Sequence, residues 1–261
     1  MRYRRTSPVR KISAAVILAA AVTGGILYGR NAAETAADME IYTGIAEAYN
    51  RSAAEYRELL EITSVGNITG LPEVPEPYEI RGKLPHEEIL RETEGIRRAW
   101  EELRYAILLA RQITGPSEEW VAGRLRTVEG ITDTAAVTKD RDPNGMLGKD
   151  GGYTACVYFA FDGVPQETIP GGDVIAKGTD GGGAVEVYRT AADAQARCVY
   201  LAQFDNTLLY TGSCAVVGTM VIRTSYALTD EEQLILTDRI TRAFTEVRQT
   251  REMEPAGTIG Q

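Results

Sequence analysis

The sequence predicts an α+β protein in which an N-terminal transmembrane helix and a long-helix hairpin or coiled-coil stalk precede a C-terminal two-layer α+β domain. Its antiparallel or mixed sheet is expected to have about four to five strands. Three observations predict this class: an uncharged run behind a basic N-terminus, two long stretches with heptad spacing, and a C-terminal part that mixes strand and helix patterns. The expected segments are a cytoplasmic basic segment (1–11), a transmembrane signal anchor (12–28), a helical stalk (31–115) with a Pro-rich linker (65–85), an extracytoplasmic α+β domain (117–248) and a flexible tail (249–261).

The N-terminus has the pattern of a signal anchor. Residues 1–28 hold five basic side chains and no acidic one, and residues 12–28 form an uncharged run of 17 residues. A helix needs about 17 to 25 apolar residues to cross a bilayer, and basic flanks stay in the cytoplasm. We therefore expect a single-pass protein of the cell membrane that contacts the lipid bilayer through residues 12–28. The alternative is a cleaved signal peptide and a secreted protein.

Charge and cysteine content argue against two kinds of function, nucleic-acid binding and zinc binding. After residue 28, 23 basic side chains face 37 acidic ones, a net charge of −14, which argues against nucleic-acid binding. Cys156, Cys198 and Cys214 form no C-x-x-C pair, and His86 is the single histidine, so no Cys/His zinc site is expected. The sequence leaves two arrangements open: one disulfide with one buried thiol, or three buried thiols.

Two long helices are predicted within residues 31–115, at about 31–64 and 86–113. Both carry residues at alternating spacings of three and four, which is a heptad seam. Four prolines between the helices favour an extended linker. We expect an antiparallel helical hairpin, with a homodimeric coiled coil as the alternative, and the seam offers a surface for self-association or a partner helix. The seam residues are Met39, Tyr42, Ala46, Tyr49, Ala53, Tyr56 and Leu60, then Ile89, Thr93, Ile96, Trp100, Leu103, Ile107 and Ala110.

The C-terminal domain alternates helix and strand signals. Ser117 and Thr190 are expected N-caps of two helices, and Thr229 with Glu232 forms a capping box that opens the last helix. Its apolar face is expected to include Leu236 and Phe244. Strands are expected at "YTACVYFAF", "AVEVYRT", "LLYTGSCAVV" and "TMVIRTS", which are rich in β-branched and aromatic residues.

One loop has the residue spacing of a calcium site. Asp140, Asp142 and Asn144 follow the D-x-D-x-N-G pattern, and Asp150 adds a fourth oxygen ligand. The position of the bidentate Glu of an EF-hand is occupied by Gly151, and a strand rather than a helix follows. "DPNG" also fits a type I turn. A structural turn is the favoured interpretation, and calcium is the one cofactor that remains a hypothesis.

Motifs for catalysis are weak. The glycines of "KGTDGGG" open a strand and lack the lysine and hydroxyl that follow in phosphate loops, so a hairpin or bulge is favoured. His86 lies in the helical region, far along the chain from Ser213 and Cys214, which argues against Ser-His or Cys-His chemistry. We expect a protein that is not an enzyme. The alternatives are an envelope enzyme using carboxylate or Ser-Lys chemistry and a calcium-responsive sensory or regulatory module.

The motifs "VTKDRDPNGMLGKDGGYTACVYF", "KGTDGGGAVEVYRTAADAQAR", "YLAQFDNT" and "GTMVIRTS" together resemble a known kind of module. It is the C-terminal extracytoplasmic module of uncharacterised membrane-anchored or lipid-anchored surface proteins of Gram-positive bacteria. The resemblance covers roughly residues 117–248 and implies an extracytoplasmic location, but it carries no functional residues to this chain. The expected function is therefore a non-catalytic binding or scaffolding role in the bacterial cell envelope.

Overall fold

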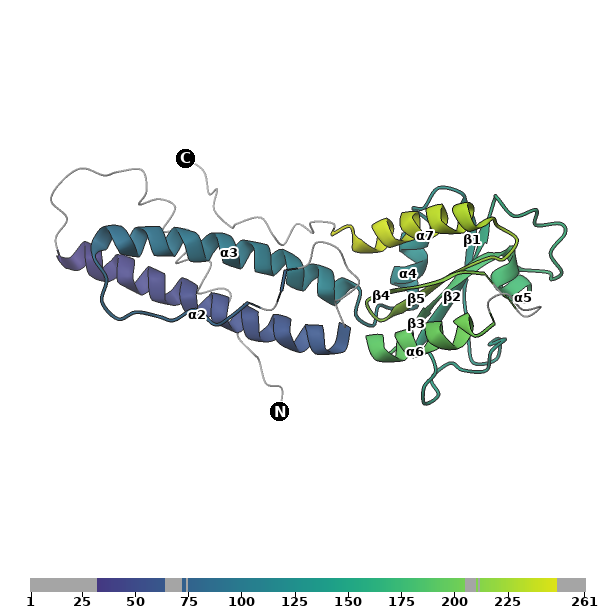
Figure 1. Cartoon of the computed structure of the whole chain (residues 1–261), viewed down its shortest axis with the longest axis horizontal. Helices are drawn as coiled ribbons and strands as arrows, with labels where there is room; N and C mark the ends of the chain where they lie inside the picture. Colours follow the sequence, from purple (N-terminus) through teal and green to yellow (C-terminus); the bar gives the residue numbers. More distant parts are fainter. Residues whose placement is uncertain (1–31, 64–71, 74, 205–209, 211, 248–261) are drawn as a thin grey trace, which may run out of the picture. The chain divides into compact units, whose positions relative to one another are not determined.

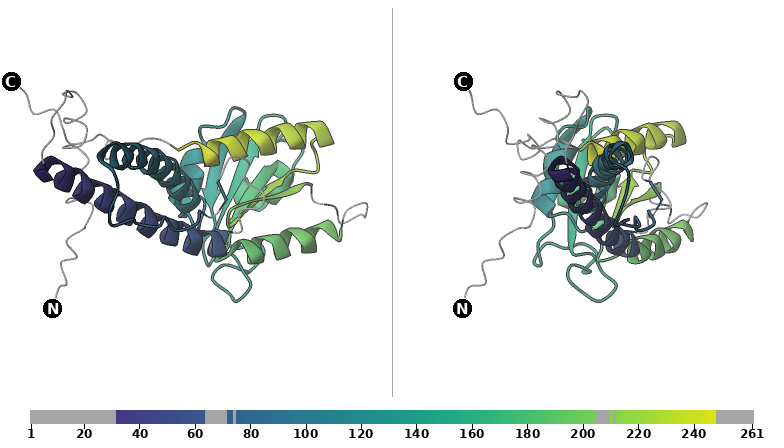
Figure 2. Two further views of the ribbon diagram at one scale, coloured as in Figure 1. Left: turned by 60° about the vertical axis from the view of Figure 1, so that its left-hand side comes forward. Right: turned by 90° about the vertical axis from the view of Figure 1, so that its left-hand side faces the viewer.

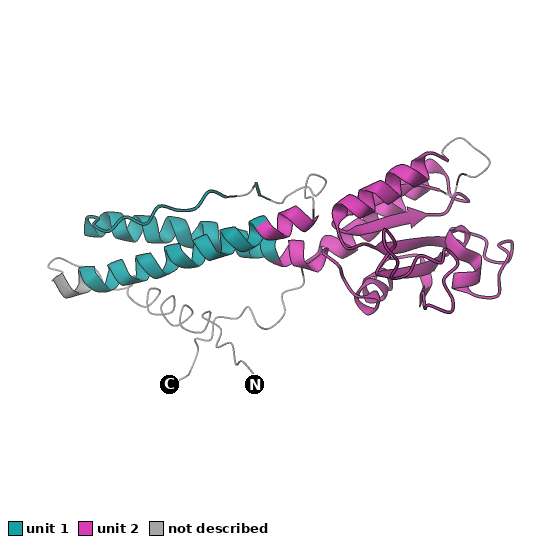
Figure 3. Cartoon of the chain, turned by 90° about the horizontal axis from the view of Figure 1, so that it is seen from below, with its two compact units in different colours: residues 1–57, 72–107, 248–261 teal, residues 58–71, 108–247 magenta. Residues whose placement is uncertain are grey.

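A computed structural model describes residues 32–63, 72–73, 75–204, 210 and 212–247. The chain divides into two compact units, unit 1 (residues 1–57, 72–107 and 248–261) and unit 2 (residues 58–71 and 108–247), coloured separately in Figure 3. The expected basic segment 1–11, signal anchor 12–28 and tail 249–261 lie outside the described residues. Within the described ranges, no helix has the length and apolar character needed to cross a membrane.

Unit 1 is built on two helices that run parallel to each other. Helix α2 (Ala32–Thr63) and helix α3 (His86–Gln112) pack through their heptad seams. The contacts advance together along both helices: His86 Nδ1 lies 3.2 Å from Asp38 Oδ2 near the start, and Trp100 Nε1 donates to Ser52 Oγ at 3.0 Å further on. Figure 1 shows both helices running in the same direction. The predicted antiparallel hairpin is therefore wrong, although most residues of the seams are buried; Met39, Tyr49, Leu60 and Trp100 are partly exposed.

The Pro-rich linker explains the parallel arrangement. Its described residues run back along α2, since Tyr56 Oη donates to the Pro72 carbonyl at 2.9 Å and Arg81 N donates to Tyr42 Oη at 3.1 Å. Between these points Asn50 exchanges two hydrogen bonds with the Tyr78 backbone, at 2.6 and 2.9 Å. The 22 residues between the helices are far more than a tight helical turn needs. An extended segment covers about 3.1 Å per residue, against 1.5 Å in a helix, so it returns the chain easily to the start of α2.

Unit 2 contains one antiparallel sheet of five strands in the order β1-β2-β3-β5-β4. The α+β class and the strand number agree with the sequence prediction. The strands are β1 (Ile131–Ala136), β2 (Ala155–Phe161), β3 (Gly182–Val187), β4 (Cys214–Val217) and β5 (Met220–Thr224). The segment "KGTDGGG" ends helix α5 (Val174–Lys177), forms the 3₁₀ turn η2 (Gly178–Gly181) and enters β3.

Helices cover both faces of this sheet, so unit 2 has three layers and the predicted two-layer domain is wrong (Figure 1 and Figure 2). Helix α4 (Glu118–Leu125) and helix α7 (Asp230–Thr245) pack on one face, and α5 and helix α6 (Ala191–Ala202) pack on the other. The reason for the third layer is the burial of the central strands on both sides. Six consecutive residues of β2, Ala155 to Ala160, and all six residues of β3 are buried, so both sides of these strands need a cover.

Candidate functional site

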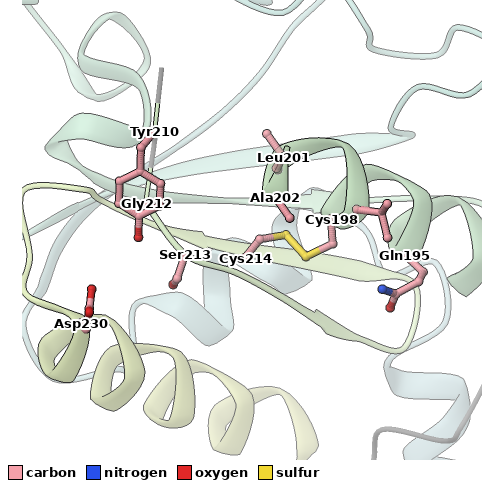
Figure 4. A pocket seen from close by; sticks show the side chains of 10 residues that line it. Gln195, Cys198, Leu201, Ala202, Tyr210, Gly212, Ser213, Cys214 and Asp230 are labelled. Carbon is pink, nitrogen blue, oxygen red and sulfur yellow. A yellow bond between two sulfur atoms is a disulfide. The ribbon is translucent and has the colours of Figure 1, made fainter. Parts of the chain in front are cut away.

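The candidate site is a pocket of about 640 Å³ at the β4 edge of the sheet. It lies between α6, β4 and the start of α7, as Figure 4 shows. Its volume falls within the range of about 300 to 1,000 Å³ that is typical of ligand sites. The lining residues are Gln195, Cys198, Val199, Leu201 and Ala202 of α6, Tyr210, Gly212 and Ser213 before β4, Cys214 of β4, and Asp230 of α7.

A disulfide forms one wall of the pocket. Cys198 on α6 is bonded to Cys214 on β4, and Cys156 is a buried free thiol. Of the two cysteine arrangements that the sequence left open, the structure has the one with a single disulfide. Burial raises the pKa of the Cys156 thiol, so this side chain stays protonated and unreactive. The disulfide therefore fixes α6 against the strand that borders the pocket.

A buried ionic cluster fixes the same helix from beneath. Glu186 of β3 is 0% exposed, and Arg197 of α6 binds its carboxylate through two hydrogen bonds of 3.0 and 3.2 Å. Arg223 of β5 donates to Glu186 Oε1 at 3.0 Å, and Tyr188 Oη donates to Oε2 at 2.8 Å. Sequence reasoning missed this cluster. The signal was an acidic residue in the middle of the apolar run "AVEVY".

Glu186 is ionised in this cluster. Burial raises the pKa of its carboxyl, but the hydrogen bond from Arg197 and the charges of Arg223 and Arg197 outweigh burial, so the pKa lies below the ordinary value. A carboxylate with a lowered pKa and guanidinium partners does not release or accept protons near neutral pH. The cluster is thus a positioning device for α6, and it supplies no acid or base.

The opposite wall of the pocket is held by helix α7. Gln233 is buried, and its Oε1 accepts from Ser213 N at 2.7 Å and from Tyr210 Oη at 3.2 Å. Gly212 has a φ of 100°, and a Cβ on it would lie 1.8 Å from the Thr224 carbonyl oxygen, so only glycine fits there. The disulfide on one side and the hydrogen bonds to Gln233 on the other therefore support the pocket.

The loop that was predicted as a turn or calcium site is organised around Asp142. Its carboxylate accepts hydrogen bonds from Asn144 N at 3.1 Å, from Leu147 N at 2.7 Å and from the Tyr153 hydroxyl. Gly145 N donates to the Asp142 carbonyl at 3.1 Å, which closes the turn. Both carboxylate oxygens thus accept hydrogen bonds from donors of the same loop, as in an Asx turn.

The other three predicted metal ligands, Asn144, Asp140 and Asp150, each have different surroundings. The Asn144 amide donates to the Tyr158 hydroxyl at 3.3 Å, Asp140 is exposed, and Asp150 Oδ1 lies 3.7 Å from Arg189 Nη1. Across the described ranges, no group of three or more His, Cys, Asp or Glu side chains is placed to hold a metal ion. Calcium binding at this loop stays a prediction.

The hydroxyl groups near the pocket also have partners of their own. The hydroxyls of Ser213 and Thr224 share a hydrogen bond, and Ser225 Oγ donates to the Asp180 carbonyl at 2.8 Å. Lys177 Nζ donates to the Gln166 carbonyl, also at 2.8 Å. None of these contacts joins a serine to a lysine. What the pocket offers is a carboxylate, an amide, hydroxyls and apolar surface, which suits binding.

The chain matches no family model, no curated protein and no solved structure. The geometry of the pocket is therefore the basis for its proposed function. The resemblance to surface-protein modules stays a prediction.

Proposed function

We propose that the protein is a membrane-anchored component of the cell envelope and that unit 2 is its non-catalytic binding module. The partner binds at the pocket between α6, β4 and α7. One observation carries this proposal: the pocket has the volume of a ligand site, a disulfide and hydrogen bonds to Gln233 support its walls, and its lining residues include neither a histidine nor a lysine. Such a site can recognise a partner, and the Ser213 hydroxyl in it shares a hydrogen bond with Thr224 rather than with a base that would activate it.

Two features support a location outside the cytoplasm. Disulfides persist in oxidising compartments and are rare in the reducing cytosol, and Cys198–Cys214 is one. The basic segment 1–11 followed by the uncharged run 12–28 has the pattern of a signal anchor. The redox state of the cysteines in living cells tests whether the protein lies outside the cytoplasm. In protein trapped with acid from living cells, an alkylating mass tag should label one cysteine before reduction and three after it. Three tags before reduction would contradict the envelope location.

Site-specific photo-cross-linking in intact cells tests the binding role. A photoreactive amino acid at Val199, which lines the pocket and is 55% exposed, should give discrete adducts with a partner. Tyr105 of α3, 49% exposed and remote in sequence from the pocket residues, is the matched control position. Adducts at Val199 that are absent at Tyr105 support the proposal. The same pattern from both positions, or no adduct from either, would refute it.

A further inference from the structure

Strand β4 presents an unpaired edge beside the pocket. It stands last in the strand order, and in the described part of unit 2 no strand pairs with its outer side. Thr224 N donates to the Ser213 carbonyl at 3.3 Å, and Val217 pairs with Met220 at the hairpin turn. Bonding alternates along an antiparallel pair. The backbone N–H and C=O groups of Cys214 and Val216 therefore point away from β5 toward the open side.

The two edges of this sheet differ in their protection. Natural proteins usually protect edge strands with charges, prolines or bulges, because a bare edge is a template for another strand. Strand β1, at the other edge, has a register shift between Ile131 and Asp133, and Asp133 is exposed. Strand β4 is four residues long, "CAVV", and it is in unbroken register without a charge, a proline or a bulge. Apart from its short length, the β4 edge therefore has less protection against the addition of a strand than the β1 edge.

The surroundings of β4 define the chemistry of such a partner. Val199 of α6 lines the pocket and is 55% exposed, and Leu234 of α7 is an exposed apolar side chain, at 70%. Leu234 follows Asp230 by one helical turn, and Asp230 lines the pocket. Glu231 is exposed next to Asp230, and no lining residue is basic. The edge therefore offers apolar contacts and negative charge.

We infer that β4 binds an extended polypeptide segment of another protein that carries both apolar and basic side chains. The segment adds a strand to the sheet through the outward backbone groups of Cys214 and Val216. Alternate side chains enter the pocket beside α6, and a lysine or arginine meets Asp230 and Glu231. This inference rests on the proposed function and names the class of partner.

Charge argues against a second copy of this chain as the occupant. The residues after position 28 carry a net charge of −14, so two β4 edges would bring acidic surfaces together. Like charges placed opposite each other oppose association, whereas a basic segment is complementary to this edge. The partner is therefore expected to be a different protein.

The test uses the full chain in detergent micelles and a phage-displayed library of random peptides of about ten residues. Selected peptides should combine apolar and basic residues. Val216→Pro removes one outward N–H and leaves the bonds to β5 intact, as proline allows at an edge strand. It should weaken binding about tenfold or more, whereas Val216→Thr keeps the N–H and should bind as the unmodified chain does.

A second variant guards against misfolding of the proline variant. Asp230→Lys with Glu231→Lys changes only exposed side chains, and it should weaken the selected basic peptides about tenfold and favour acidic ones. Peptides that bind equally well to Val216→Pro and to the charge variant would overturn the strand inference while leaving a binding role in place. Failure to enrich any peptide, or a dimer that Val216→Pro converts to monomer, would overturn it too. The cross-linking at Val199 tests the proposed function separately.

Discussion

Removal of the buried carboxylate of Glu186 is the most demanding test of the structure. Glu186→Ala removes the buried carboxylate that pairs with Arg223, whose side chain is 7% exposed, and with Arg197, at 19%. It also removes the acceptor of the Tyr188 hydroxyl. Removing one partner of a buried ion pair costs about 3 to 5 kcal/mol, because the other charge stays buried without compensation. We expect unit 2 to lose about 4 kcal/mol of unfolding free energy.

Urea unfolding followed by tryptophan fluorescence measures this loss. The chain has two tryptophans, and Trp120 of unit 2 packs on Phe244 with ring centroids 5.5 Å apart. In a Trp100→Phe background the signal reports unit 2 alone. With a urea dependence of about 2 kcal/mol per molar, the midpoint should fall by about 2 M. The control is Asp238→Asn, which breaks an exposed pair with Arg242 and should cost less than about 1 kcal/mol.

Two further results separate charge from packing. Adding Arg223→Met to Glu186→Ala removes a buried guanidinium that has lost the Glu186 carboxylate, and it should recover about 1 to 2 kcal/mol. A depressed carboxyl pKa stabilises the fold above the unfolded value of about 4.3, and this stabilisation is lost as pH falls through the folded pKa. The difference between the wild type and Glu186→Ala should thus be full at pH 7 and shrink below pH 4. A loss no larger than that of Asp238→Asn, or one independent of pH, would refute the reasoning.

Three other predictions concern single contacts. Replacing Cys198 and Cys214 by serine opens a loop with a sequence separation of 16 and should cost about 3 kcal/mol, measured by thermal unfolding of the full chain against the disulfide-bonded form. Asp142→Ala leaves backbone donors without an acceptor and should cost about 2 kcal/mol, while calcium or chelator leaves the melting temperature of the wild type unchanged; a calcium-dependent rise would instead support the metal hypothesis. Asn50→Ala removes both hydrogen bonds to the Tyr78 backbone and should speed proteolysis of the Pro-rich linker, and equal rates would contradict its role.

Features that depend on neighbours in the sequence were predictable. Ser117 and Thr190 cap their helices, and Thr229 with Glu232 forms the expected capping box. The 3.5-residue repeat predicted both long helices within one or two residues of their observed ends. The caps depend on local hydrogen bonds, and the long helices depend on the spacing of apolar residues. Both can be recognised from short stretches of sequence.

Strand burial was only partly predictable. The runs "ACVYFA" and "GGAVEV" contain apolar residues at successive positions, a pattern typical of strands covered on both faces. We nevertheless expected two layers, because strand periodicity alone does not show which helices pack on which face. Strand β1, "ITDTAA", contains polar and partly exposed residues, and it lacks the apolar run that predicts β2 and β3.

The sequence by itself determined the α+β class, the helix limits, the caps and the charge that argues against nucleic acid. Only the tertiary structure decided that α2 and α3 run parallel, that Cys198 rather than Cys156 bonds Cys214, and that Glu186 is surrounded by two arginines. It also decided that the pocket lies beside an open strand edge. These features join residues that lie far apart in the chain, and packing rather than local propensity selects among the pairings that the sequence permits.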